Sequence, residues 1–198
     1  MKLISIFVSF LCLASSSFAD QNAIAKSKDG SGIEPQKDLH EKTSGIAPKS
    51  PQASLATIRV QSGLVVEIVA AEPLIADPVA FDWGTDGRLW VVEMGDYPDG
   101  IGSGKKPGGH VKILTDSNGD GRYDKATLFL DGLNFPTAVK AWQQGVLILA
   151  APDILYAEDS NGDGRADLKK VLFSGFGQGN QQHRANGLRW RLDGMLQV

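Results

Sequence analysis

The stretch DSNGDGRYD, from Asp116 to Asp124, recurs almost unchanged as DSNGDGRAD from Asp159 to Asp167. Asn, Gly and Asp form tight turns, because glycine adopts positive φ angles and Asn or Asp side chains bond to nearby backbone N–H groups. Each copy lies between two short apolar runs, HVKILT and ATLFL in the first case, DILYAE and KKVLF in the second. The same turn in the same context predicts a structural unit that occurs twice.

Short runs rich in β-branched and aromatic residues surround each turn, and Gly, Asp and Pro separate them. VVEIVA (65–70) comes first, and the first set of four follows it: VAFDW (79–83), LWVVEM (89–94), HVKILT (110–115) and ATLFL (126–130). The second set consists of AVKAW (138–142), VLILAA (146–151), DILYAE (153–158) and KKVLF (169–173), after which GLRWRLDG (187–194) begins a third. We predict an all-β chain in which the recurring tryptophans belong to the core.

Four short strands per unit, with the acidic turn between the third and the fourth, match the blade of a β-propeller. We therefore predict an incomplete β-propeller, made of two four-stranded blades and the start of a third. A small β-sandwich built from the same strands is the alternative. Because closed propellers typically have at least four blades, we expect the chain to be the amino-terminal part of a longer protein. The insertion at 97–109 lengthens one loop of the first blade, and such loops often carry function.

The amino terminus has the pattern of an export signal. Residues 1–19 combine Lys2, an apolar run too short to span a bilayer comfortably, and small residues before Asp20. A retained membrane anchor is the alternative. Cys12 is the only cysteine, so we expect the mature, exported chain to have no thiol. Removal of the signal also leaves no transmembrane segment predicted in the mature chain. Residues 20–57 are rich in Lys, Ser, Gly, Pro and Gln without aromatic residues, which predicts a disordered linker before the propeller part at 58–198.

The charge of the chain argues against one class of partner. The formal net charge is −3 at pH 7, and no run of Lys and Arg suited to phosphate backbones is present. We therefore expect no nucleic-acid partner.

The acidic turns have the spacing of calcium ligands. Oxygen-bearing side chains stand at the first, third, fifth and ninth positions, and a glycine at the sixth permits the sharp turn. Thr127 and Lys170 replace the Glu expected at the twelfth position of an EF-hand. A hairpin turn without any ion explains the same composition. The predicted ligands are Asp116, Asn118, Asp120 and Asp124 in the first turn and Asp159, Asn161, Asp163 and Asp167 in the second.

Long phrases of the sequence carry a family resemblance. VAFDWGTDGRLWVVEMGDYPDG, FPTAVKAW, GVLILAAPDILYAEDSNGDGRAD and GFGQGNQQHRANGLRW together cover much of 58–198. They resemble the amino-terminal part of the exported membrane-bound dehydrogenase propellers of planctomycete-type bacteria. That family is more distantly similar to soluble quinoprotein glucose and sorbosone dehydrogenases. The resemblance implies a six-bladed propeller that holds pyrroloquinoline quinone near its axis and oxidises a sugar or other alcohol, with an unknown electron acceptor.

The same resemblance assigns roles to three residues before the third blade. In QQHRANGL, His183 matches the histidine that removes the alcohol proton, a role suited to a group that titrates near neutrality. Arg184 and Asn186 are then expected to line the cofactor cavity. A histidine that hydrogen-bonds within a polar loop is the alternative reading.

Two further features complete the hypotheses. Glu93 and Asp96 lie at the end of the strand LWVVEM and either bind substrate or a cation, or form a salt-bridged strand end. His110 is interpreted as structural. Beside the dehydrogenase hypothesis stands a non-catalytic propeller, stabilised by calcium, that binds a glycan or a protein. Fold alone does not choose between them, since propellers host many functions.

Overall fold

The computed structural model describes residues 47–98 and 107–198, so the predicted export signal lies outside the described residues. The chain divides into two units, of which the smaller contributes residues 47–58 to the described part. This segment contains helix α2, Pro51–Leu55, which begins after Ser50, whose hydroxyl accepts a hydrogen bond from Ala53 N–H at 3.2 Å. The helix lies within the linker predicted for residues 20–57. No helix in the described ranges is long and apolar enough to cross a bilayer.

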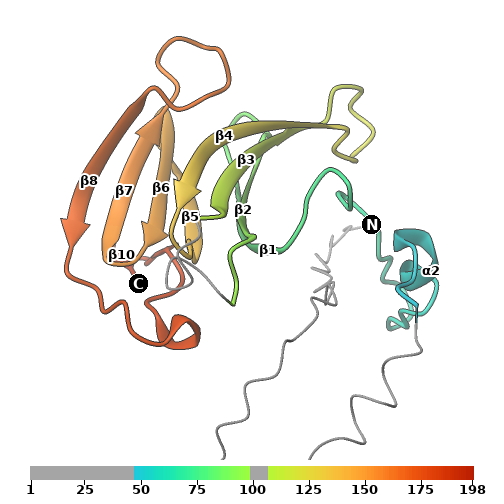
Figure 1. The fold of residues 1–198 in the computed structure, drawn as a ribbon. Coiled ribbons are helices and arrows are strands. Elements are labelled where there is room, and N and C mark those ends of the chain that lie inside the picture. The colour runs from blue at the N-terminus through green and yellow to red at the C-terminus, as the bar shows by residue number, and fades with distance from the viewer. Residues whose placement is uncertain (1–46, 99–106) are drawn as a thin grey trace, which may run out of the picture. The chain divides into compact units, whose positions relative to one another are not determined.

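The larger unit, from Arg59 to Val198, consists of antiparallel strands in the predicted repeat (Figure 1). Two sheets have four strands each, and consecutive strands lie side by side in both. A third sheet has two short strands. The first blade comprises β1 (Pro78–Trp83), β2 (Leu89–Met94), β3 (Gly109–Thr115) and β4 (Lys125–Leu133). The second comprises β5 (Ala138–Trp142), β6 (Gly145–Ala150), β7 (Asp153–Glu158) and β8 (Leu168–Ser174), and the third begins with β9 (Arg189–Trp190) and β10 (Leu196–Gln197).

The architecture confirms the predicted all-β fold class: two four-stranded antiparallel sheets follow one another as propeller blades do, and a two-stranded sheet comes after them. The two blades pack face to face through one apolar cluster, to which β2 contributes Trp90 and Val92 and β6 contributes Val146 and Ile148. Every residue of β6 is buried, because this strand has apolar neighbours on both faces of its sheet. Burial on both faces explains why VLILA reads as a continuous apolar run instead of an alternating one.

The second acidic turn links the two blades. Ala166 N–H, inside this turn, donates to the carbonyl of Phe129 on β4 at 2.8 Å. Gly164 approaches β4 so closely that a Cβ atom there would lie 3.0 Å from Thr127 Cγ2. The repeated turn therefore packs each blade against the element that precedes it, and this packing gives the sequence repeat a structural role that requires no ion.

The predicted strand at Val65–Ala70 is wrong, because these residues form no β-ladder. They nevertheless occupy an instructive position. Tyr123 N–H, which corresponds to Ala166 N–H in the repeat, donates to the carbonyl of Val69 at 2.8 Å. Val69 thus contacts the first blade as Phe129 of β4 contacts the second. Val65–Ala70 has the apolar pattern of a strand but forms no ladder with a neighbouring strand. Apolar pattern alone does not predict whether a segment pairs with another strand.

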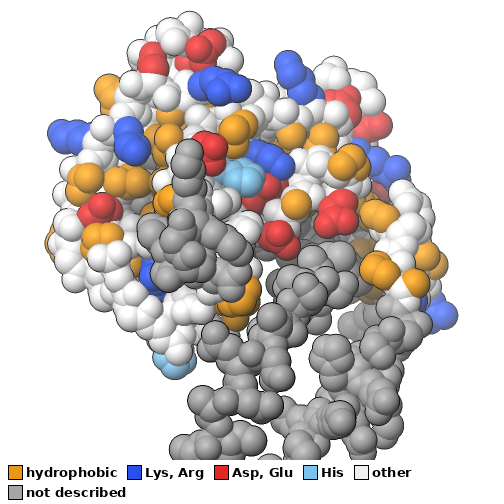
Figure 2. Space-filling view, viewed as in Figure 1, with side chains coloured by type: hydrophobic (Ala, Val, Ile, Leu, Met, Phe, Trp, Pro, Cys, Tyr) orange, Lys and Arg blue, Asp and Glu red, His pale blue; other side chains and the backbone are white. Residues whose placement is uncertain are grey.

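The surface carries charges of both signs. Figure 2 shows basic and acidic side chains interspersed over the described part of one face, without a broad basic area.

Candidate functional site

The segment before the third blade forms a single turn of 3-10 helix, η2, at Gln181–His183. Asn180 caps this turn, since its side-chain oxygen accepts a hydrogen bond from Gln182 N–H at 2.8 Å. The side chains of His183 and Asn186 are exposed, whereas Arg184 is half-buried. His183 therefore stands at the surface of a turn whose shape depends on Asn180 and on backbone bonds.

This turn meets the long loop of the first blade. Gln181 Nε2 donates to the carbonyl of Pro98 at 3.1 Å, and Gln182 Nε2 donates to the hydroxyl of Tyr97 at 2.8 Å. The remainder of the insertion, 99–106, lies outside the described residues. We call the first strand of each blade (β1, β5 and β9) its inner strand. Residues that are far apart in the sequence thus come together at the end where the inner strands begin. Sequence analysis identified both segments but not their contact.

Arg184 is held beneath this turn. Its guanidinium lies 4.8 Å from the ring centroid of Phe135, a cation–π contact, and Nη2 donates to the carbonyl of Gln178 at 3.0 Å. Phe135 is in the loop between β4 and β5 and has a φ of 47°. Positive φ is costly for a bulky side chain, and such conformations concentrate at functional sites.

Four buried polar atoms near Arg184 have no hydrogen-bond partner among the described residues. They are Arg184 Nε and Nη1, Asp96 Oδ1 and Asn134 Oδ1, and no other buried side-chain atom in the described ranges shares this property. The other oxygen of Asp96 accepts from Phe135 N–H at 3.3 Å. Buried polar groups are normally paired, so unpaired ones require an explanation. We call Asp96, Asn134, Phe135 and Arg184 the Arg184 site.

A second polar group, the Glu93 cluster, consists of Glu93 on β2 with His110 and Lys112 on β3. Glu93 is 1% exposed, and its Oε2 lies 2.6 Å from His110 Nε2 and 2.9 Å from Lys112 Nζ. Its Oε1 accepts from Ala76 N–H at 3.0 Å. Both carboxylate oxygens are thus engaged within the protein. The geometry agrees with the salt-bridged strand end that was one of the two readings of Glu93, and with a structural His110.

The contacts in the cluster shift two pKa values in opposite directions. Burial by itself would raise the pKa of Glu93, but hydrogen bonds from His110, Lys112 and Ala76 N–H outweigh burial and lower it. The hydrogen bond to Glu93 raises the pKa of His110 against the opposing effect of burial. The charged forms of both residues are therefore favoured in the folded state.

The acidic turns are closed by their own hydrogen bonds. Asp116 Oδ1 accepts from Gly119 N–H at 2.8 Å, and its Oδ2 accepts from Gly121 N–H at 2.8 Å. The carboxylate of Asp124 accepts from the N–H and the hydroxyl of Ser117, at 3.2 and 2.5 Å, and these bonds lower its pKa. The second turn repeats the same bonds through Asp159, Gly162, Gly164, Ser160 and Asp167.

The predicted calcium ligands do not all converge. Asn118 Nδ2 and Asp120 Oδ2 lie 3.2 Å apart, as do their counterparts in the second turn at 3.3 Å, but Asp124 and Asp167 face serines. Within 47–98 and 107–198, no three His, Cys, Asp or Glu side chains form a group that could hold a metal ion. Calcium binding stays a prediction. Calorimetry with calcium tests it, and an absence of heat would leave the turns as hydrogen-bonded links between blades.

Comparison with known protein families gives a match. The family model of DUF7133, described as a domain of unknown function, matches residues 50–198. The chain belongs to this family. No curated protein and no solved structure matches the DUF7133 chain. The DUF7133 match includes helix α2, both blades and the start of the third, so the family domain begins inside the predicted linker.

Sequence analysis of this DUF7133 domain missed Asn134, Phe135 and Lys112. Asn134 and Phe135 lie in the loop before β5, and His183 lies in the corresponding loop before β9. This shared position in the repeat could have identified them from the sequence. Lys112 faces Glu93 because it lies two residues after His110 on the same face of β3, and His110 pairs with Glu93 in the strand register.

The Glu93 cluster predicts a pH dependence of stability for the DUF7133 domain. His110 has a raised pKa, so its contribution is fully present below its ordinary value of 6.5 and is lost as the pH rises through the raised value. Glu93 has a lowered pKa, so its contribution is present above its ordinary value of 4.5 and is lost as the pH falls through the lowered value. Urea unfolding should show that His110→Gln destabilises the protein more at about pH 5.5 than at about pH 8.5. An equal loss at both values would contradict the cluster.

Proposed function

We propose that this DUF7133 chain is part of an exported quinoprotein-like dehydrogenase that oxidises a sugar or other alcohol. The proposal adopts the resemblance to the membrane-bound dehydrogenase propellers and locates the reaction at the end where the inner strands begin. The Arg184 site is the observation that supports it most. Three loops, which carry Asp96, Asn134 and Arg184, leave buried polar atoms without partners around one aromatic ring.

The unpaired atoms suit the groups that such a reaction requires. Arg184 is cationic and has two nitrogens without a partner, Nε and Nη1, whose N–H groups fit a carboxylate of pyrroloquinoline quinone. The free oxygens of Asp96 and Asn134 fit the hydroxyl donors of a sugar or an alcohol. Unsatisfied buried groups cost free energy, and a ligand that satisfies them recovers this cost.

His183 has the assigned role of general base. Its exposed side chain, adjacent in sequence to Arg184, is available to accept the hydroxyl proton of the alcohol. Bound pyrroloquinoline quinone supplies the hydride acceptor. Arg184 holds and orients an anionic group, and exposed Asn186 adds an amide to the same segment. No step of this proposal uses calcium.

Reconstitution of the full-length protein tests the proposal. We expect pyrroloquinoline quinone, a panel of sugars and alcohols, and an artificial electron-accepting dye to give turnover that depends on the quinone. The same assay with and without calcium measures any contribution of the acidic turns. Absence of quinone-dependent turnover, together with absence of quinone binding, would remove the dehydrogenase proposal.

A non-catalytic propeller that binds a glycan or a protein is the second candidate. Two observations favour it. The acidic turns are closed by hydrogen bonds between their own residues, as expected of structural links. Aromatic side chains also line a pocket. Under this candidate the protein binds its ligand but reduces no dye.

A further inference from the structure

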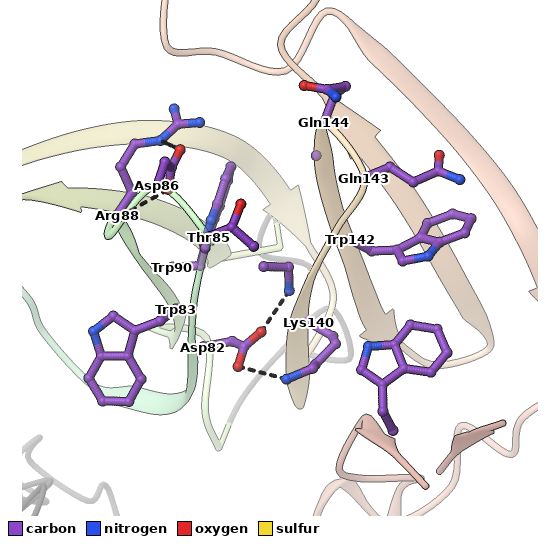
Figure 3. Close-up of a pocket in the computed structure, with 14 residues that line it drawn as sticks. Asp82, Trp83, Thr85, Asp86, Arg88, Trp90, Lys140, Trp142, Gln143 and Gln144 are labelled. Atoms are coloured by element: carbon purple, nitrogen blue, oxygen red, sulfur yellow. Dashed lines mark hydrogen bonds and ion pairs between the residues drawn. The ribbon is translucent and has the colours of Figure 1, made fainter. Parts of the chain in front are cut away.

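A pocket of about 270 Å³ lies where the inner strands end. The hairpin between β1 and β2, the hairpin between β5 and β6, and strand β9 all contribute residues to it (Figure 3). Asn134 and Phe135 precede β5, whereas Trp142 is its last residue. The pocket and the Arg184 site are therefore at opposite ends of β5.

All four tryptophans of the sequence line this pocket: Trp83, Trp90, Trp142 and Trp190. Sequence analysis assigned them to the core, and for Trp90, 3% exposed, this is correct. For Trp83 and Trp190, which are 47% and 43% exposed, it is wrong. Trp83, Trp142 and Trp190 recur because each inner strand places one at the same end of its blade. Figure 3 shows the Trp83 indole directed away from Lys140, and its Nε1 donates to the hydroxyl of Tyr123 at 2.9 Å. The exposed indole surface at the pocket therefore comes from Trp190, together with the half-buried Trp142.

The charges in the pocket are already paired. Lys140 Nζ lies 2.8 Å from Asp82 Oδ1, and Figure 3 shows the Asp82 carboxylate directed at Lys140. The second oxygen of Asp82 accepts from the backbone N–H of Ala141 at 2.8 Å. Arg88 pairs in the same way with Asp86. Two carboxylates are thus balanced by two cations, which leaves hydrogen-bonding capacity without a net charge that would attract an ion.

The turn between β5 and β6 adds neutral polar groups. Gln143 and Gln144 both line the pocket and bring amides that donate and accept hydrogen bonds. Gln143 has a φ of 53°, a left-handed conformation that costs free energy in a residue other than glycine. The strained turn thus holds two amides at the rim of an aromatic pocket.

We propose that this tryptophan pocket binds a neutral saccharide. A sugar ring has an apolar face, which packs on an exposed indole, and hydroxyl groups at its edge, which bond to amides and carboxylates. The paired charges favour an uncharged ligand over a sugar acid. The volume lies near the lower limit of ligand pockets, so a single ring fits better than a bulky ligand. The proposal is independent of the dehydrogenase proposal, because it uses neither His183 nor the Arg184 site.

Tryptophan fluorescence of the full-length protein tests the pocket directly. The probes are the methyl glycosides of glucose, galactose and mannose, together with methyl glucuronide as a charged probe. We expect a saturable change in emission with at least one neutral glycoside, and weaker binding of the glucuronide. Trp142→Ala should weaken glycoside binding at least about tenfold, while Trp142→Phe retains part of the affinity.

Controls assign the signal to the pocket. Phe173→Ala removes an exposed aromatic residue of β8 outside the pocket and should not change glycoside binding. Because Trp142 also packs against Tyr156, with ring centroids 5.5 Å apart, Trp190→Ala provides a second variant at a more exposed position. Circular dichroism confirms that each variant is folded.

Three results would overturn the proposal. They are no saturable response to any neutral glycoside, a response unchanged in both folded tryptophan variants, and preferential binding of the glucuronide. Dye reduction by Trp142→Ala separates the two proposals. If this variant loses glycoside binding but reduces dye normally, the pocket is a binding site distinct from the Arg184 site. If the wild type and Phe173→Ala bind glycosides in the pocket but no quinone-dependent dye reduction is found, only the dehydrogenase proposal fails.

Discussion

Glu93→Ala is expected to lower the free energy of unfolding by about 3 kcal/mol or more. The substitution removes a buried carboxylate that binds His110, Lys112 and the N–H of Ala76. Without it, two cationic groups on β3 and the backbone donor of Ala76 lose their shared acceptor. Most of this cost comes from leaving His110 and Lys112 partly buried without an acceptor. The attraction to Glu93 contributes less, because the desolvation of the charges already offsets much of it in the wild type. Urea unfolding at about pH 5.5, where both partners are charged, measures the loss.

Two variants make this test specific. Glu93→Gln retains an oxygen acceptor without the charge and should fall between the wild type and Glu93→Ala. Asp193→Ala removes one partner of the exposed pair with Arg191, whose atoms lie 3.2 Å apart, and should cost less than about 1 kcal/mol. If Glu93→Ala proved no more destabilising than Asp193→Ala, the Glu93 cluster would not stabilise the fold.

The repeat made the blades predictable. The turn DSNGDGR, the short β-branched runs and the glycines are local signals, and each strand of the two blades pairs with its neighbour in sequence. Local pattern suffices for such a topology. Val65–Ala70 shows the limit, since its pattern is that of a strand but the ladder requires a partner that pattern does not name.

The candidate sites were less predictable because they depend on contacts between distant residues. The family resemblance directed attention to Arg184, but its position over Phe135 and beside Asp96 depends on how three loops meet. The tryptophans show a different limit. Composition places tryptophan in a core, whereas the ends of the inner strands leave Trp83 and Trp190 half-exposed. Such exposure follows from the tertiary arrangement and not from residue type.

His183→Ala is expected to reduce quinone-dependent turnover of the full-length protein by about 10²- to 10⁴-fold, the usual contribution of a general base. The fold should be unaffected, because the side chain is exposed and the turn around it is held by Asn180. The maximal rate should fall much more than the apparent affinity for substrate, since a base acts on the proton in the transition state. Arg184→Ala should instead weaken quinone binding, as it removes the cation of the Arg184 site.

The pH profile distinguishes a base from a residue that only shapes its loop. If His183 accepts the proton, the pH dependence of the wild-type rate should change when His183 is replaced by Ala. His110→Gln is the matched histidine control, because the side chain of His110 bonds to Glu93, and this variant should keep the wild-type pH profile. Full activity in His183→Ala would remove the histidine from the chemistry. A reduced rate with an unchanged pH profile would make His183 a positioning residue and move the search for the base to the neighbouring carboxylate of Asp96.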